Sequence, residues 1–257
     1  MNISKNAFVT GATNGTGYAI ATEFAKNGYN VVITSRTESA AIEAANSLSA
    51  DYPDVAVIGV GLQTDSEQEV VDLFNRLDEQ SLAPDCLVCN AANLGIGMDF
   101  LNTTREQFMS VFEINLGWNF TLAREAAKRM KEKNCGSIVF ITSNTAYRAI
   151  PDRCAYSSSK SGVLGLSRAL AVDLGKYGIR SNCVLPGMIK TTRWQNTPAL
   201  HKVPSNFTPI GDIAEFEDIA AAAYFLSSPA AKNITGAELI VDGGNTIQLY
   251  PNVPKDI

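Results

Sequence analysis

The sequence predicts an α/β fold, a doubly wound parallel sheet of about seven strands with helices on both faces. Two patterns predict it. Short apolar runs rich in β-branched residues alternate with helical segments along the whole chain. A glycine-rich turn also joins the first strand to the first helix. Because no Pro/Ser-rich linker and no block of charges divides the sequence, we expect a single domain over residues 1–257.

The first strand, residues 7–10, runs directly into the turn Gly11-Ala-Thr-Asn-Gly15-Thr-Gly17, and an amphipathic helix follows through Lys26. Glycines let the backbone bend sharply and let a phosphate approach. The helix N-terminus adds unpaired N–H groups and a partial positive charge. The turn therefore predicts a dinucleotide site and a sheet of the Rossmann type.

The second strand, residues 30–34, ends in Ser35-Arg36, and a helix is expected over 37–50. In a dinucleotide site this strand end meets the adenosine ribose, where an acidic side chain binds a 2′-hydroxyl and an arginine accommodates a 2′-phosphate. Ser35 and Arg36 therefore favour NADP(H) as the cofactor. NAD(H) is the alternative if Arg36 is only a solvated surface residue.

A third strand at 55–60 and a helix at 67–80 precede a fourth strand at 85–89, which ends in Asn90-Ala-Ala-Asn93. A long helical region then spans 104–133. It carries Asn115 in apolar surroundings, and a buried amide needs hydrogen-bond partners.

The fifth strand, residues 137–142, ends at Ser143, and a helix over 154–177 carries Tyr156 and Lys160. A spacing of four puts the phenol and the ammonium on one helix face, about one turn apart. A cation within roughly 4–6 Å lowers the pKa of a tyrosine by one to three units, toward the range of a general acid/base. These side chains predict a proton-transfer site, although Tyr-x-x-x-Lys alone is also an ordinary pair on a half-exposed helix.

The sixth strand, residues 179–185, is closed by Pro186-Gly187. The segment at about 188–211 shows no sustained period, and we interpret it as a substrate lid. A helix at 215–226 and a last strand at 237–241 complete the pattern.

Composition argues against several kinds of partner. With 46% apolar residues, 18% charged residues and a net charge of −5, the chain lacks the basic surplus of a nucleic-acid binder. Its apolar runs have strand length and no signal peptide is recognised, so we expect a cytoplasmic protein without membrane partners. The five cysteines form an odd set, as expected of reduced thiols, and no metal site is predicted.

The order and separation of the motifs resemble the short-chain dehydrogenase/reductase family from residue 7 to residue 244. The motifs that carry the resemblance are Thr10-Gly11-x-x-x-Gly15-x-Gly17, Asn90-Ala91, Asn115, Ser143, Tyr156-x-x-x-Lys160 and Pro186-Gly187-x-x-x-Thr191. The sequence departs from the family in two places. Cys89-Asn90-Ala91-Ala92 stands where the family usually has Asn-Asn-Ala-Gly, and Leu62 or Gln63 stands where an aspartate commonly meets the adenine.

The resemblance implies a catalytic tetrad of Asn115, Ser143, Tyr156 and Lys160. Tyr156 looks like the acid/base and Lys160 like its pKa-lowering neighbour and ribose ligand. Ser143 would bind the substrate oxygen, and Asn115 would hold a proton-relay water. Besides Tyr156 and Lys160, the implied cofactor contacts are Gly11, Thr13, Asn14, Gly15, Thr16, Gly17, Ser35, Arg36, Leu62, Gln63, Asn90, Ala91, Pro186, Gly187, Ile189 and Thr191.

The function that the resemblance implies is an NADP(H)-dependent oxidoreductase that interconverts a ketone or other carbonyl and a secondary alcohol. One alternative is an NAD-dependent sugar or polyol dehydrogenase of the same family. Another is a non-enzymatic nucleotide-sensing protein on the same fold. The family also implies a homo-oligomer, either a tetramer or a dimer.

The segments expected to line the substrate crevice are mostly apolar, which favours a substrate with an apolar body over a sugar. Arg148, Arg153 and Arg193 are exceptions, since any of them could hold a carboxylate or a phosphate. The expected substrate contacts are Ser143, Tyr156, Tyr147, Ile150, Met188 and Trp194.

Overall fold

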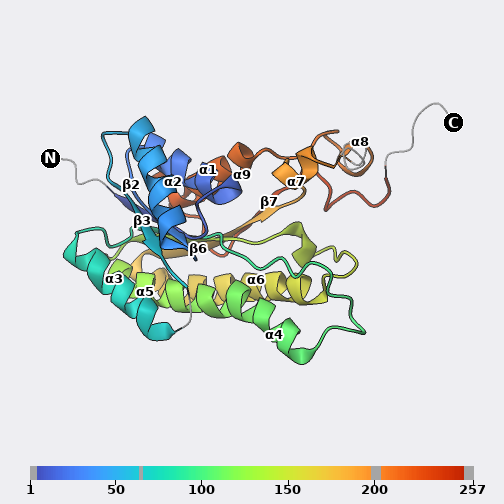
Figure 1. Cartoon of the computed structure of the whole chain (residues 1–257), viewed down its shortest axis with the longest axis horizontal. Helices are drawn as coiled ribbons and strands as arrows, with labels where there is room; N and C mark the ends of the chain where they lie inside the picture. Colours follow the sequence, from blue (N-terminus) through green and yellow to red (C-terminus); the bar gives the residue numbers. More distant parts are fainter. Residues whose placement is uncertain (1–4, 64–65, 198–203, 252–257) are drawn as a thin grey trace.

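Seven parallel strands form one sheet in the order β3-β2-β1-β4-β5-β6-β7 (Figure 1). The structure, a computed structural model, describes residues 5–63, 66–197 and 204–251. From β1 the strand order runs to β3 on one side of the sheet and from β4 to β7 on the other, so the order reverses between β1 and β4. Sheets of this kind bind ligands outside the carboxyl ends of the strands at this point. The strands are β1 (Asn6–Val9), β2 (Asn30–Ser35), β3 (Val57–Gly61), β4 (Cys86–Cys89), β5 (Gly136–Ile141), β6 (Ile179–Pro186) and β7 (Glu238–Val241).

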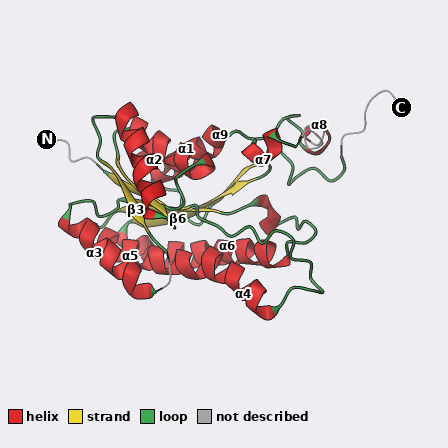
Figure 2. Ribbon diagram, in the orientation of Figure 1, coloured by secondary structure: helices red, strands yellow, loops and turns green. Residues whose placement is uncertain are grey.

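Helices cover both faces of the sheet, as Figure 2 shows. One layer contains α1 (Gly15–Lys26), α2 (Glu38–Asp51) and α9 (Phe216–Ser227). The opposite layer contains α3 (Glu67–Glu79), α5 (Trp118–Lys133) and α6 (Cys154–Leu174), with α4 (Arg105–Phe112) near one end. This arrangement confirms the predicted doubly wound α/β fold.

Each face of the sheet has its own apolar core, which explains why the strands are continuous apolar runs rather than alternating ones. Ala7 and Val9 of β1 belong to the core beneath α1, together with Ile20 and Phe24. Phe8, between them in the sequence, belongs to the opposite core and stacks on Phe74 of α3, with ring centroids 5.4 Å apart.

The predicted strand boundaries agree with the structure to within two residues, but the helical region 104–133 does not continue as one α-helix. The helix α4 begins at a capping box formed by Thr104 and Gln107. A π-helical turn over Glu113–Gly117 then separates it from α5. The helix expected at 154–177 ends as α6 at Leu174, and a 3₁₀ turn continues to Tyr177.

The expected lid contains two short helices, α7 (Thr192–Gln195) and α8 (Pro204–Phe207), and its residues 198–203 lie outside the described part of the chain. Its base is fastened to the start of α9. A β-bridge pairs Ile189 with Ala214, and Lys190 forms ion pairs of 2.8 Å with Asp212 and with Glu215. Within the described residues, none of the helices is long and apolar enough to cross a membrane.

Candidate active site

The glycine turn after β1 is held by a network between Thr10 and Asn90. The Thr10 hydroxyl accepts from the backbone N–H groups of Asn90 and Ala91, at 2.9 and 3.0 Å. The Asn90 amide donates to the carbonyl oxygens of Thr10 and Gly11, at 3.0 and 3.1 Å. The amide of Asn90 therefore fixes the shape of the turn, a role that sequence reasoning had not assigned to it.

The turn fits the pyrophosphate of a dinucleotide. Gly11 and Gly15 have φ values of +60° and +53°, which L-residues with side chains rarely adopt. A Cβ at Gly17 would lie 2.3 Å from the Gly11 carbonyl oxygen, so the close packing of the turn requires a glycine. Asn14, the N-cap of α1, makes no side-chain capping bond. The first N–H groups of α1 are thus left for an anion.

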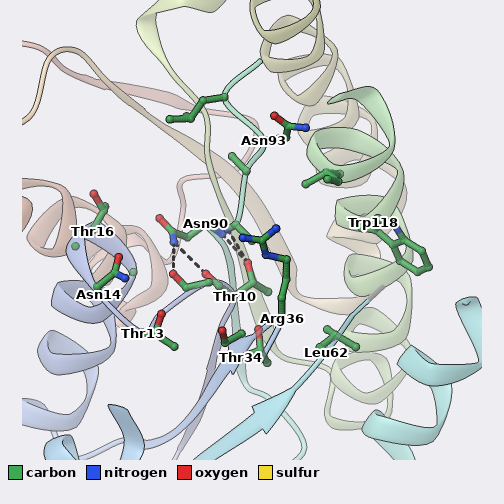
Figure 3. A pocket seen from close by; sticks show the side chains of 18 of the residues that line it. Thr10, Thr13, Asn14, Thr16, Thr34, Arg36, Leu62, Asn90, Asn93 and Trp118 are labelled. Atoms are coloured by element: carbon green, nitrogen blue, oxygen red, sulfur yellow. Dashed lines mark hydrogen bonds between the residues drawn. The ribbon is translucent and has the colours of Figure 1, made fainter. Parts of the chain in front are cut away.

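A cavity of about 1010 Å³ extends from this turn past the ends of β2 and β4 to α5 (Figure 3). Arg36 is the only charged residue among the described residues that line it. Of the expected cofactor contacts, Gln63, Tyr156, Lys160, Pro186, Gly187 and Ile189 do not line the cavity. Those that do are Gly11, Thr13, Asn14, Gly15, Thr16, Gly17, Ser35, Arg36, Leu62, Asn90, Ala91 and Thr191.

Sequence reasoning missed the wall of the cavity that α5 and the preceding π-helical turn provide. Ile114, Trp118 and Leu122 all line the cavity, and they are spaced four residues apart. Figure 3 shows Trp118 and Leu62 near the end of the cavity where Arg36 lies. The spacing is a helical stripe, so it could have been found as an apolar face within 104–133.

Ser143 and Tyr156 meet beyond the carboxyl end of β5. The Ser143 hydroxyl accepts from the N–H of Thr145 at 3.1 Å, and the Ser143 side chain lies near enough to the Tyr156 phenol to influence its pKa. Burial raises the pKa of Tyr156 above its ordinary value, and Ser143 and the charge of Arg153 offset this effect only in part. The phenol is therefore protonated at neutral pH, which is the form of a general acid.

Lys160 lies beneath the ring of Tyr156, with its Nζ 5.6 Å from the ring centroid. The ammonium is buried and donates to the Ile141 carbonyl oxygen at 2.8 Å. Burial lowers the pKa of Lys160 to about 8, although the thiols of Cys183 and Cys89 act in the opposite direction. In the protein without a bound cofactor, burial dominates the pKa of Tyr156 and the cation that acts on the phenol is Arg153. The pKa-lowering role of Lys160 stays a prediction.

Asn115 lies in the π-helical turn and is fully buried. Its Oδ1 accepts from the N–H of Asn93 at 2.7 Å, and its Nδ2 donates to the Asn93 carbonyl and to the Ser159 hydroxyl, both at 2.9 Å. The Asn115 backbone carbonyl accepts from the Asn119 amide at 2.7 Å. Asn115 thus joins the segment after β4 to α6 through direct protein contacts, and its proton-relay role stays a prediction.

The other expected substrate contacts are dispersed. The Tyr147 hydroxyl donates to Glu238 on β7, so the polar end of this side chain is already engaged at the edge of the sheet. Ile150 and Met188 are 48% and 37% exposed, and Trp194 is partly buried in α7.

The arginines of these segments differ in their surroundings. Arg148 donates to the carbonyl oxygens of Asn245 and Gln248 in the C-terminal segment. Arg153 donates to the carbonyl oxygen of Leu94 at 2.6 Å. The side chain of Arg193 lies outside the described part of the structure.

Known proteins resemble this chain over nearly its full length. The model of the family described as enoyl-(acyl carrier protein) reductase matches residues 11–246. A 3alpha-hydroxysteroid dehydrogenase of Mediterraneibacter gnavus is 34% identical over 241 residues, which cover 93% of this chain and 96% of that protein. An NADP-dependent (R)-specific alcohol dehydrogenase of Lentilactobacillus kefiri is 36% identical over 251 residues, covering 95% and 97%. The crystal structure of a putative gluconate dehydrogenase from Agrobacterium tumefaciens is 30% identical with a TM-score of 0.89, covering 95% and 97% of the two chains.

Proposed function

The chain belongs to the short-chain dehydrogenase/reductase family, and from that premise we propose that it interconverts a ketone and a secondary alcohol with NADP(H), using Tyr156 as general acid/base. Membership of the family makes the protein an NAD(P)-dependent oxidoreductase of CH–OH and C=O groups. The observation that carries the finer proposal is the placement of the Ser143 side chain near the Tyr156 phenol, with Lys160 Nζ 5.6 Å from the centroid of the Tyr156 ring. This pair lies close to the cofactor cavity, since Leu94 lines the cavity and Gly95 packs against Tyr156.

In the reduction direction Tyr156 donates its proton to the carbonyl oxygen of the substrate. Ser143 hydrogen-bonds the same oxygen while negative charge develops on it, so the donors are in place before the charge forms. The bound dinucleotide supplies the hydride. Lys160 uses one N–H for the Ile141 carbonyl, and its remaining donors can hold the ribose hydroxyls. In the oxidation direction Tyr156 accepts the proton of the alcohol.

The preference for NADP(H) rests on the charge of the cavity. Arg36 lies at the end of β2, where the adenosine ribose of a bound dinucleotide is contacted. No acidic residue is among the described residues that line the cavity. A guanidinium provides several N–H donors in a rigid fork, which suits a phosphate monoester. A relative named as NADP-dependent, from Lentilactobacillus kefiri, supports this choice.

The proposed substrate is a ketone or secondary alcohol with an apolar body. Leu94 and Ile96 follow β4 and are 50% and 57% exposed, and Met188 and Ile150 are exposed near the other strand ends. A relative named for a hydroxysteroid supports an apolar substrate. A sugar acid is the second candidate, because one of the similar structures is that of a putative gluconate dehydrogenase.

The proposal is tested by following absorbance at 340 nm with NADPH or NADH and a panel of carbonyl compounds. We expect consumption of NADPH with bulky ketones or steroids at a higher kcat/KM than with keto-sugars or keto-gluconates. A higher kcat/KM for the sugar compounds would transfer the assignment to the second candidate. No oxidation of either coenzyme with any compound would contradict the proposed reaction. Cytoplasmic location and assembly as a homo-oligomer are further parts of the proposal.

A further inference from the structure

The segment Leu94–Met98 lies over the catalytic tyrosine. A Cβ built on Gly95 would be 3.7 Å from Tyr156 Cβ and 3.4 Å from Val111 Cγ2 of α4, so this glycine packs its backbone onto both side chains. The φ of Gly95 is +55°, and its N–H is held by the Asn93 side chain at 3.0 Å. The apolar side chains of Leu94 and Ile96 remain half exposed. The segment thus joins an apolar surface to the acid/base residue.

Arg153, three residues before Tyr156, fastens this segment at two points. Its Nη1 donates to the Leu94 carbonyl oxygen at 2.6 Å, and its backbone pairs with Met98 in an isolated parallel β-bridge. Arg153 is also the N-cap residue of α6, and its own carbonyl accepts from the Ser157 N–H at 2.9 Å. A single residue therefore connects the first turn of the catalytic helix to both ends of the segment.

We propose that Arg153 is a positioning residue of the active site, which holds the segment Leu94–Met98 over Tyr156 and places a permanent positive charge beside the phenol. The inference rests on the proposed role of Tyr156 and deepens it. Movement of the segment Leu94–Met98 and the acidity of the Tyr156 phenol are then coupled, because the same guanidinium controls both.

The ionisable groups around Tyr156 support the electrostatic half of this role. Ser143 faces the phenol from beyond β5 as a neutral hydroxyl, and Lys160 lies beneath the ring with its ammonium bonded to a backbone carbonyl. Tyr147, in the adjacent turn, donates to Glu238. The segment Leu94–Met98 itself has no ionisable side chain. Arg153 is the charged group that lowers the pKa of Tyr156 against the effect of burial.

The first test is the pH dependence of alcohol oxidation, measured as kcat/KM with NADP in excess, in the wild type and in Arg153→Gln and Arg153→Lys. Oxidation requires deprotonated Tyr156, so its rate rises through the pKa of this group. Loss of the positive charge in R153Q should move the rising limb of the pH profile to higher pH by about one unit. R153K should keep the position of this limb within about 0.3 unit. A limb that is the same in R153Q and the wild type overturns the electrostatic half.

The second test does not depend on activity. Amide hydrogen exchange in residues 94–98 should become at least about tenfold faster in both R153Q and R153K, because glutamine is two bonds shorter and lysine one bond shorter than arginine, so neither brings a donor to the Leu94 carbonyl in the same geometry. Arg148→Gln is the matched control, since Arg148 also donates to backbone carbonyls but in the C-terminal segment. R148Q should accelerate exchange near residues 245–248, leave residues 94–98 protected and leave the pH profile unchanged. Unchanged exchange at 94–98 in both Arg153 variants overturns the positioning role.

The R153K variant keeps the inference testable if R153Q does not fold. For R153K we expect an unshifted pH profile together with faster amide exchange in residues 94–98, a combination that is not expected of R153Q. A limb shifted by a full unit in R153K would contradict it. The proposed function fails separately. If Tyr156→Phe retains wild-type turnover, Tyr156 is not the acid/base, whereas the exchange result still decides whether Arg153 fastens the segment.

Discussion

Tyr156 lies in surroundings that oppose its ionisation. Burial raises its pKa, Ser143 and the charge of Arg153 lower it in part, and the ammonium of Lys160 donates to a backbone carbonyl. A neutral phenol suits donation of a proton to a carbonyl oxygen, so the unliganded site is poised for reduction rather than for oxidation. Oxidation of an alcohol should then be favoured by alkaline pH.

Removal of the phenol hydroxyl tests this role directly. Tyr156→Phe keeps the ring that packs against Gly95 and above Lys160, so the fold and the affinity for NADPH should be retained. Turnover should fall by roughly two to four powers of ten, the range for a lost general acid. Steady-state assays measure turnover and the dependence on NADPH concentration, and a thermal unfolding curve measures whether the fold is retained. Turnover near that of the wild type would rule out the mechanism.

Arg36 should decide between the two coenzymes. Arg36→Ala removes the only cation among the described residues of the cavity lining, so kcat/KM for NADPH should fall at least about tenfold while that for NADH changes little. The ratio of the two kcat/KM values, measured in both proteins, is the readout. A wild-type enzyme that already uses NADH equally well would contradict the preference.

Lys160 should make the stability of the free enzyme depend on pH in a defined direction. Its pKa is lowered from 10.5 to about 8 in the fold, so its charged form is disfavoured in the native state. The penalty is fully present below pH 8 and disappears as pH rises toward the unfolded value. At neutral pH this penalty is on the order of 3 kcal/mol.

Urea unfolding of Lys160→Met and the wild type at pH 7 and pH 10 measures this effect. The free energy of unfolding of K160M relative to the wild type should fall by roughly 2–3 kcal/mol over this range, because the variant lacks the titrating group. The loss of the hydrogen bond to the Ile141 carbonyl affects K160M at both pH values, so it cancels when the two differences are compared. Lys26→Met, at a lysine whose side chain is 65% exposed, is the control and should show no such change. A constant difference for K160M would show that Lys160 is not strained by burial.

At the scale of elements, the glycine turn and the π-helical turn each place polar groups of the site. The glycine turn was recognisable because its glycines have a sequence signature. The π-helical turn was not, because its residues Glu113–Gly117 carry no comparable signature. It is this turn that buries Asn115 and directs its amide to Asn93 and Ser159.

Sequence patterns describe local geometry, and this explains which side-chain roles could be predicted. Strand ends and helix spacing bring Ser143, Tyr156 and Lys160 to one place, and this part of the prediction follows from regular geometry. The direction of the Lys160 ammonium and the contact of Arg153 with Leu94 depend on packing between segments far apart in the sequence. No local pattern encodes those contacts.

The packing of the glycine turn predicts the effect of Gly17→Ala. The added methyl group would lie 2.3 Å from the Gly11 carbonyl oxygen and 2.6 Å from the Asn90 amide nitrogen, so the turn must shift. Affinity for NADPH should weaken at least about tenfold, since phosphate binding depends on the aligned N–H groups of this turn. Fluorescence titration measures the affinity. Gly165→Ala, where a methyl group meets open space in α6, should leave it within about twofold, and equal affinities in G17A and the wild type would contradict the phosphate role.

At the scale of the whole molecule, the two layers of helices present different surfaces. In the layer with α5 and α6, Phe120 is 47% exposed and Val172 is 81% exposed. Large apolar side chains with such exposure mark surfaces that a partner covers when they gather on one face. The proposed homo-oligomer would bury this layer, while the opposite layer with α1 and α2 would stay in solvent.

Light scattering tests this assembly. The wild type should have the mass of two or four chains, and Val172→Glu should lower it, because a charge would be buried without a partner in the interface. Ile42→Glu is the matched control, since Ile42 is 43% exposed on α2 in the opposite layer, and its mass should equal that of the wild type. A monomeric wild type would refute the assembly. An oligomer that survives in V172E but dissociates in I42E would move the interface to the layer of α1 and α2.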